Sequence, residues 1–438
     1  MASIVAASKS IFRPAEPRVT VVSQRPPLEY SMLLTATLCL LAGGAVMVYS
    51  ASAPSTVTGG GSGTGVLVRF VGYGLVGLVV LRLASRRGLE VVRRFTGPLL
   101  VVSFLLLVAV RLPGVGRGGS LGSQRWIGVG PLQFQPSELA KLALILYAAH
   151  IFSASRPGPR TLKIAFRRLL VVGGCCCALV ASQPDIGTTL VIFLALVAVV
   201  LTAGVRLRHL AIAGLVCAVL VGGFALLQPY ATKRLTSFTD PWAHATTTGF
   251  QSVQSQIAIG SGGLLGRGPG ASTQKDGWLP NASTDFILAV VGEELGFVGI
   301  AALLGLYGMI AFAGLRAARR APPGYPMLVA VGVTAVILFQ ASLNVFAVLG
   351  LAPVTGVPLP FVSYGASNLL VMLGGMGLLL NVAGGGAVGA ATVHRTRTKK
   401  TPRSDDARTT ADRDRSRRDR GSRRARTRGG ARPARTRG

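Results

Sequence analysis

Acidic side chains mark the start of one apolar run in the second half of the chain. Asp285 closes the polar stretch GWLPNASTD, and Glu293 and Glu294 follow inside the apolar run. An ionisable residue inside a membrane span costs at least about 2.5 kcal/mol, which makes each of these a candidate for function. A partly exposed carboxylate within hydrogen-bond reach of a hydroxyl can act as a general base. Asp285 is therefore the candidate base, and an N-terminal helix cap is its alternative role.

The two glutamates are expected to have a different role. If a helix starts near Asp285 and runs inward, Glu293 and Glu294 lie roughly 12 Å further along it at 1.5 Å per residue. A carboxylate at that depth is either paired or protonated. We interpret Glu293 and Glu294 as structural residues that tie this helix into its neighbours.

A second polar group opens two other apolar runs. Arg125 precedes the run that begins with Gln135, Glu138 and Lys141, and Asp185 opens a further run in QPDIGTT. Glu138 and Lys141 are three residues apart, so they share one helix face and can pair. The pair is either a structural contact or part of an anion site with Arg125, whose planar fork suits phosphate. Asp185 is either a helix cap or a functional carboxylate.

The elements that position these residues are membrane spans. Hydrophobic residues make up 50% of the 438 and charged residues 14%, and the mean hydropathy is +0.54. Several uncharged runs reach the ~20 residues that cross a bilayer, without the alternation of a barrel. The sequence predicts an all-α polytopic membrane protein with about ten spans. These are about 31–50, 65–82, 96–112, 136–153, 168–183, 186–204, 210–229, 286–315, 326–348 and 362–384.

Basic loops set the expected orientation. Lys and Arg follow the second, fourth, sixth and eighth spans, which places those span ends and both termini in the cytoplasm. The predicted organisation is a cytoplasmic segment 1–30, a membrane domain 31–385 and a cytoplasmic tail 386–438. The long segment of about 230–285 between spans seven and eight is then extracytoplasmic, and a loop of that length is usually functional.

The charge of +31 is concentrated rather than spread. From Arg395 onward there are 18 Lys or Arg residues and 5 Asp, a net charge of +13 with almost no apolar residue. Such a tail is expected to be disordered and to bind either the anionic inner leaflet or an acidic partner. No nucleic-acid motif accompanies it, so specific nucleic-acid binding is not expected. The five cysteines all lie in apolar runs without metal-ligand spacing.

The polar groups face one leaflet and combine cations with carboxylates. That combination fits a site for a phosphate-bearing, lipid-linked substrate, but it also fits a transporter of such a lipid or a scaffold that docks partners. A transporter would require an alternating-access geometry, often with inverted repeats, which the sequence does not show.

Five sequence motifs are more informative about function than the composition is. They are YSAS (49–52), RWIGVGPLQFQPSELAK (125–141), QPDIGTT (183–189), LPNASTDFILAVVGEELGFVG (279–299) and PLPFVSYGASNLL (358–370). With these motifs in this order, residues 30–385 of the chain resemble the SEDS family (shape, elongation, division and sporulation). This is the FtsW/RodA/SpoVE group of peptidoglycan polymerases.

The resemblance implies an enzyme of the outer leaflet that polymerises lipid II, a disaccharide-pentapeptide on undecaprenyl pyrophosphate. It implies that Asp285 is the catalytic base. It further implies that the substrate-binding residues are Arg125, Gln135, Glu138, Lys141, Asp185 and Ser363. The pyrophosphate leaving group needs cations, from Arg125 and Lys141 or from a divalent ion such as Mg²⁺ or Mn²⁺, with no other cofactor. The implied partner is a class B penicillin-binding protein, a transpeptidase that crosslinks the strands.

The chain departs from the family pattern at two places. SYGASN (363–368) stands where SYGGSS is common, and Ser283 stands where a histidine commonly precedes the TDF aspartate. The phrases VVGEELGFVG and QPSELAKLAL favour a division-type member located at the septum with other division proteins. GASTQ (270–274) resembles the elongation type, which remains the alternative.

Overall fold

The computed structural model describes residues 26–58, 63–118, 124–129, 132–154, 159–227 and 237–385. All of these residues belong to one compact unit within Met1–Ala390. The predicted tail 386–438, and nearly all of the predicted segment 1–30, lie outside the described residues.

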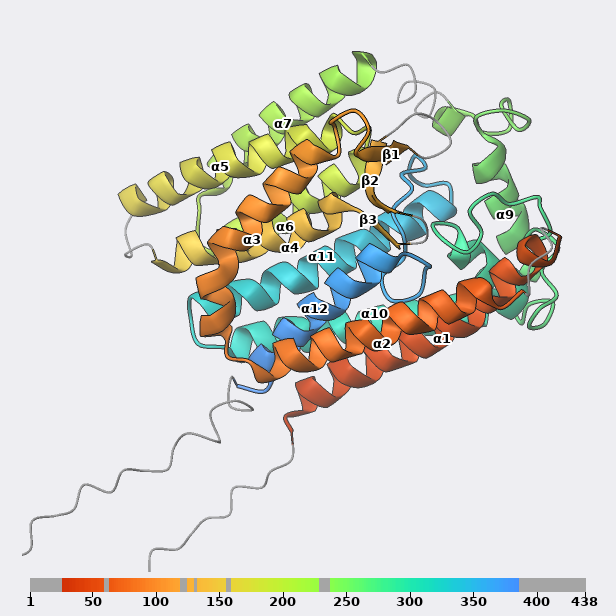
Figure 1. Cartoon of the computed structure of the whole chain (residues 1–438), viewed down its shortest axis with the longest axis horizontal. Helices are drawn as coiled ribbons and strands as arrows, with labels where there is room; N and C mark the ends of the chain where they lie inside the picture. The colour runs from red at the N-terminus through yellow and green to blue at the C-terminus, as the bar shows by residue number, and fades with distance from the viewer. Residues whose placement is uncertain are drawn as a thin grey trace, which may run out of the picture. The chain divides into compact units, whose positions relative to one another are not determined.

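Helices form where the apolar runs predicted them. Figure 1 shows their arrangement, in which long helices lie roughly along one common direction. Those that match the ten expected spans are α1 (Leu28–Thr58), α2 (Gly65–Arg86), α3 (Leu89–Ala109), α4 (Pro136–Ala154), α5 (Pro159–Ala181), α6 (Ile186–Thr202), α7 (Leu207–Leu227), α10 (Ile287–Arg320), α11 (Tyr325–Val348) and α12 (Ala366–Ala383). A further helix, α9 (Phe250–Gly262), lies inside the long predicted loop.

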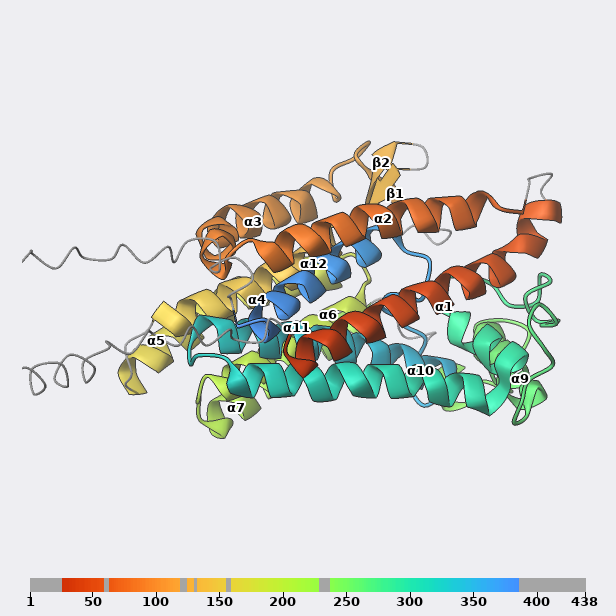
Figure 2. The same ribbon diagram turned by 90° about the horizontal axis from the view of Figure 1, so that it is seen from below.

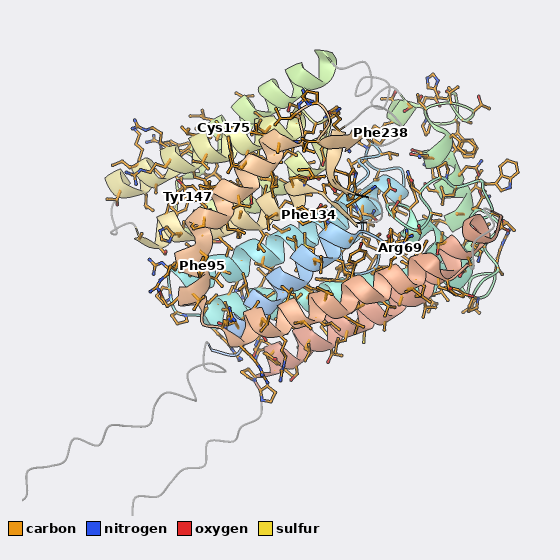
Figure 3. All side chains as sticks on the ribbon, viewed as in Figure 1. Arg69, Phe95, Phe134, Tyr147, Cys175 and Phe238 are labelled. Atoms are coloured by element: carbon orange, nitrogen blue, oxygen red, sulfur yellow. The ribbon has the colours of Figure 1, made fainter. Side chains whose placement is uncertain are left out.

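Length and composition support a membrane-spanning bundle. Within the residues described, eight helices are long and apolar enough to cross a membrane, and α6 is a shorter apolar helix of 17 residues. The exposed Arg69 lies near the start of α2, where a long side chain can reach the interface (Figure 3). The all-α polytopic prediction is confirmed.

A small sheet was not predicted. Strands β1 (Gly116–Gly118), β2 (Gln124–Val129) and β3 (Leu132–Phe134) form an antiparallel sheet in the order β1-β2-β3. Ile127 of β2 pairs with Gly116 on one side and with Phe134, which is labelled in Figure 3, on the other. These strands are short and glycine-rich, so no run of alternating residues indicated them. The sheet leads directly into α4 and places Arg125 beside it.

Three helices form the centre of the bundle. In the most apolar 18-residue stretch of each helix, 83% of α12 is buried, 67% of α11 and 61% of α4. The corresponding share is only 17% in α3 and 22% in α2. Figure 2 shows α11 and α12 enclosed between α2 and α3 on one side and α10 on the other. A helix that is apolar all round and buried belongs to the core, and one whose apolar side chains stay exposed faces lipid.

α10 is two helices rather than one. Gly296 has φ +66° and ψ −162°, which no helix interior adopts. A Cβ at Gly292 would lie 3.1 Å from Cδ1 of Ile300, although eight residues of straight helix would separate the two by roughly 12 Å. The chain therefore folds back at Gly296: residues 287–295 form a short buried helix that packs against the start of the span 297–320.

This reversal corrects the expected depth of the glutamates. The end of the span at Arg316 and Arg320 pairs with Glu29 of α1, and Ser50, twenty-one residues further along α1, donates to Glu294 at 2.6 Å. Glu294 thus lies at the opposite end of α1, about 30 Å away at 1.5 Å per residue. Because residues 287–295 run outward, the prediction that Glu293 and Glu294 lie deeper than Asp285 is wrong.

Candidate functional site

Asp285 is half-buried just before the short helix 287–295. Its Oδ1 accepts a hydrogen bond from Thr284 Oγ1 at 2.8 Å, and its backbone carbonyl accepts one from Asn344 Nδ2 at 2.7 Å. The helix N-cap is Phe286, and its side chain makes no capping bond. A Cβ added to Gly356 would lie 3.8 Å from Asp285 Oδ2, so the segment 349–361 approaches the carboxylate closely. The carboxylate is held from its backbone side and keeps partial access to its surroundings.

Asn344 fixes two chain segments at once. Its Nδ2 also donates to the carbonyl of Val357 at 2.8 Å, and one turn earlier on α11 Gln340 Nε2 donates to the carbonyl of Pro358 at 2.9 Å. Both amides are buried in the core. A buried polar side chain that satisfies a loop carbonyl fixes that loop, since an unpaired carbonyl would cost free energy. α11 therefore connects the PLPF motif to Asp285.

The predicted Glu138–Lys141 contact is present and is fully enclosed. Lys141 Nζ lies 2.8 Å from Glu138 Oε2 and donates to Gln340 Oε1 at 2.5 Å, while Asn368 Nδ2 donates to Glu138 Oε2 at 2.8 Å. The two charged side chains are 0% and 1% exposed. The geometry favours the structural ion pair of the two interpretations, because the two charged groups contact each other and the buried amides of Gln340 on α11 and Asn368 on α12. Direct contact of Glu138 or Lys141 with substrate stays a prediction.

Arg125 and Gln135 attach the sheet and α4 to the QPD motif. Arg125 Nε donates to the carbonyl of Gln183 at 2.8 Å, and its Nη2 donates to the carbonyl of Pro184. Gln135 Nε2 donates to Asp185 Oδ2 at 3.1 Å. Two of the five N–H donors of the guanidinium are engaged in this way. Arg125 is half-buried, so it is the predicted phosphate ligand with the greater access.

Asp185 is a helix cap, as one alternative proposed. Its Oδ1 accepts from the amide of Thr188 at 3.2 Å, and it is the N-cap residue of α6. Its other oxygen binds Gln135, so both carboxylate oxygens are committed to protein donors. A capping carboxylate at a helix N-terminus is stabilised by the free amides and by the helix dipole.

The SYG motif folds into a turn at the same place. Ser363 Oγ accepts from the amide of Leu359 at 2.9 Å, and the amide of Tyr364 donates to the carbonyl of Ser283 at 2.9 Å. The backbone of Ser283 therefore joins two motifs, although the sequence suggested a role only for the side chain at this position. Ser367 accepts from the amide of Gln135 at 2.9 Å, which gives the SYGASN variant a structural contact. Ser363, predicted to bind substrate, holds this turn in place.

Glu293 and Glu294 organise the loop that follows α9. Glu293 accepts from Ser272 Oγ at 2.5 Å and from Thr273 Oγ1 at 2.9 Å, and Arg267 pairs with it at 3.3 Å. Glu294 pairs with Lys275 at 2.8 Å. The prediction that both are buried and paired agrees with these contacts, but their partners come mainly from the loop 266–275 instead of from other spans.

The described residues contain no group of three or more His, Cys, Asp or Glu side chains that could hold a metal ion. Glu138 and Asp185 are committed to protein donors, so these two do not fit as ligands. A divalent ion that Asp285 would share with substrate phosphates stays a prediction, since Mg²⁺ is commonly held by one or two carboxylates and phosphate oxygens.

Comparison with known proteins identifies the family. The FtsW/RodA/SpoVE model, described as a cell cycle protein, matches residues 30–385. The chain belongs to this family. The chain is 38% identical to stage V sporulation protein E of Bacillus subtilis over 352 residues, 80% of this chain and 96% of that protein. It is 37% identical to a probable peptidoglycan glycosyltransferase FtsW of Trichlorobacter lovleyi, over 82% of this chain and 94% of the relative.

Solved structures of FtsW/RodA/SpoVE members share the fold. A chain of a peptidoglycan synthase complex, described as coordinating polymerization and crosslinking, superposes with a TM-score of 0.66 at 32% identity, covering 80% of this chain and 96% of that one. The rod shape determining protein RodA of Thermus thermophilus gives 0.59 at 30% identity, covering 80% and 95%. The chain is a multi-pass protein of the cytoplasmic membrane.

In this FtsW/RodA/SpoVE member, sequence reasoning missed the side chains that connect the motifs. Gln340 and Asn344 lie in a stretch without charged residues, and Asn368 lies in a variant motif. A signal was present, because two amides four residues apart in an apolar helix share one face. An amide inside a span is rarely placed there without a partner.

Proposed function

We propose that this chain is a peptidoglycan glycosyltransferase that polymerises lipid II into glycan strands on the outer face of the membrane. The observation that carries the proposal is the half-buried Asp285, held by Asn344 at the point where the motifs of residues 279–299 and 358–370 meet. Curated relatives carry the name peptidoglycan glycosyltransferase, which supports the reaction class.

The proposed reaction requires removal of one hydroxyl proton and departure of one leaving group. The 4-hydroxyl of one lipid II attacks the anomeric carbon of the growing strand, the bond from that carbon to the pyrophosphate oxygen breaks, and lipid pyrophosphate leaves. The Asp285 carboxylate takes the hydroxyl proton, a role that contributes typically about 10²–10⁴-fold to rate. Arg125 is the cation we assign to the pyrophosphate, because a guanidinium binds phosphate oxygens in a fork.

The other motif residues support this pair of groups. Gln135, Glu138, Lys141, Asp185 and Ser363 hold α4, α6 and the SYG turn against one another through the contacts described above. We assign them to positioning, because misplacement of a reacting group by about 1 Å can cost 10²-fold in rate.

We further propose a septal location, cytoplasmic termini and a crosslinking transpeptidase partner of the class B penicillin-binding type. The FtsW names of relatives favour the division role over elongation. The likeness to a complex of polymerization and crosslinking supports the partner. Arg316, Arg319 and Arg320 at one end of α10 support the cytoplasmic assignment of that end.

The test separates polymerisation from transport of the same lipid. The full chain is reconstituted in vesicles with lipid II, with and without the transpeptidase, and both glycan length and lipid II translocation are measured. Glycan strands are the expected product. Lipid II movement across the bilayer without any strand formation, under conditions where the partner is present, would contradict the proposal and favour a transporter.

A further inference from the structure

A groove away from the proposed active site opens between α5, α6 and α7. Its apolar part is a cavity of about 90 Å³ lined by residues that include Phe166, Cys177, Phe193 and Val200. Gly174 also lines it, and a Cβ there would meet no atom within 4 Å. Figure 1 shows α5 and α7 side by side, and Figure 3 marks Cys175 on α5 in this region. The groove is an apolar slot facing the bilayer.

The length of this slot matches one leaflet. Phe166 and Cys177 are eleven residues apart on α5, which is about 16 Å at 1.5 Å per residue. Half of a hydrocarbon core of roughly 30 Å is about 15 Å. The slot starts near the cytoplasmic ends of α5, α6 and α7, and its extent along α5 is about the length of one acyl chain.

A basic chamber continues the slot at its cytoplasmic end. This chamber, of about 270 Å³, shares Phe166 with the apolar slot and is lined by Lys163, Arg206, Arg208 and His209. Phe166 and His209 meet edge to face with ring centroids 6.4 Å apart, which forms the junction. Among the described residues, no carboxylate lines the chamber and none of its three Lys and Arg side chains is in an ion pair.

We propose that this chamber and slot bind an anionic phospholipid of the inner leaflet, with its phosphate in the chamber and an acyl chain in the slot. Basic residues in cytoplasmic loops are expected from topology alone. Topology does not explain why Lys163 at the start of α5 and Arg206 and Arg208 at the start of α7 converge on one chamber that opens into an apolar slot. A negative headgroup on an apolar chain complements both parts, whereas a free phosphate complements only the first. This inference does not rest on the glycosyltransferase assignment.

The first experiment removes the charges. The full chain in detergent is titrated with phosphatidylglycerol and with phosphatidylcholine, and bound lipid is counted by native mass spectrometry. The variant Lys163→Gln/Arg206→Gln/Arg208→Gln is compared with Arg86→Gln/Arg87→Gln/Arg94→Gln, which removes equal charge from another cytoplasmic loop. Each cation near an anionic lipid contributes about 1 kcal/mol, about fivefold in affinity, so the first variant is expected to lose at least about tenfold for phosphatidylglycerol.

The second experiment fills the slot. Gly174→Leu adds a side chain where the structure has open space, and Gly43→Leu does the same in a different lipid-facing groove between α1 and α10. Gly174→Leu is expected to weaken binding of both lipids several-fold, while Gly43→Leu leaves binding unchanged. Soluble glycerol phosphate is expected not to compete.

Three results would overturn the inference. These are equal affinity of the wild type for the two lipids, equal losses in the two triple variants, and full competition by glycerol phosphate. If a variant fails to fold, phosphatidylglycerol with a photoreactive acyl chain is applied to the wild type instead. Crosslinks concentrated on α5, α6 and α7 support the site, and crosslinks spread over the lipid-facing surfaces of α2 and α10 contradict it.

Discussion

Removing one charge from the Glu138–Lys141 pair should destabilise the protein more than removing both. Lys141→Met leaves the Glu138 carboxylate, 1% exposed, with the amide of Asn368 as its one described donor. Glu138→Gln leaves the ammonium of Lys141, 0% exposed, with the oxygen of Gln340. Breaking a buried pair from one side typically costs about 3–5 kcal/mol, because the remaining charge is buried and unpaired.

The double variant Glu138→Gln/Lys141→Met removes both charges and retains amides near Asn368. We expect it to be more stable than either single variant, with a coupling free energy of several kcal/mol in the double-mutant cycle. The matched control is the pair of Glu90 and Arg93, also three residues apart at 3.9 Å, whose side chains are 88% and 32% exposed. A pair with this access to solvent is expected to contribute at most about 1 kcal/mol.

The assay is thermal unfolding of the purified full chain in detergent, for the wild type, both single variants, the double variant and the control pair. Size-exclusion profiles check that each variant is a folded monodisperse protein before heating. Additive losses in the cycle, or single variants as stable as the control, would refute the enclosed ion pair.

Three further predictions concern the site and its supports. Asn344→Leu should lower the polymerisation rate by about 10²-fold, with a smaller effect on unfolding, because displacing a reacting group by about 1 Å costs that much rate. Thr334→Val in the same helix is the control. Equal activity of the two variants would contradict the role of Asn344 in positioning Asp285. Lys275→Met should speed hydrogen exchange and proteolysis in residues 266–275, because it removes the ion pair with Glu294. Unchanged exchange there would contradict the role of Glu294 in holding this loop. Gly296→Ala should prevent stable insertion, because Gly296 has φ +66° and a Cβ there would meet the loop backbone. Gly305→Ala should be tolerated, because nothing lies within 4 Å of a Cβ at that position. A stable Gly296→Ala protein would contradict the chain reversal at Gly296.

The helices were predictable because each apolar run fills a bilayer. The pairing of Glu138 with Lys141 and the cap at Asp185 followed equally from local spacing. The reversal at Gly296 did not, because a glycine within EELGFVG also fits an ordinary helix. Only the docking of the loop from Gly262 to Gly268 on that backbone, through the amides of Arg267 and Gly268, shows why the helix breaks.

The connections among the motifs depended on long-range contacts. Gln340 meets Lys141 across 199 residues of sequence, and Asn368 meets Glu138 across 230. No local pattern encodes such pairs. The roles of Ser363 and Ser283 changed for the same reason, since one caps a turn through its hydroxyl and the other acts through its backbone carbonyl.

Lipid II polymerisation by the full chain carrying Asp285→Asn tests whether Asp285 is the catalytic base. The control is Asp276→Asn, which removes an exposed carboxylate from the preceding loop. We expect a loss of about 10²–10⁴-fold in strand formation for Asp285→Asn, with normal folding and insertion, and no loss for Asp276→Asn. Strand formation by Asp285→Asn at the wild-type rate would show that another group takes the proton.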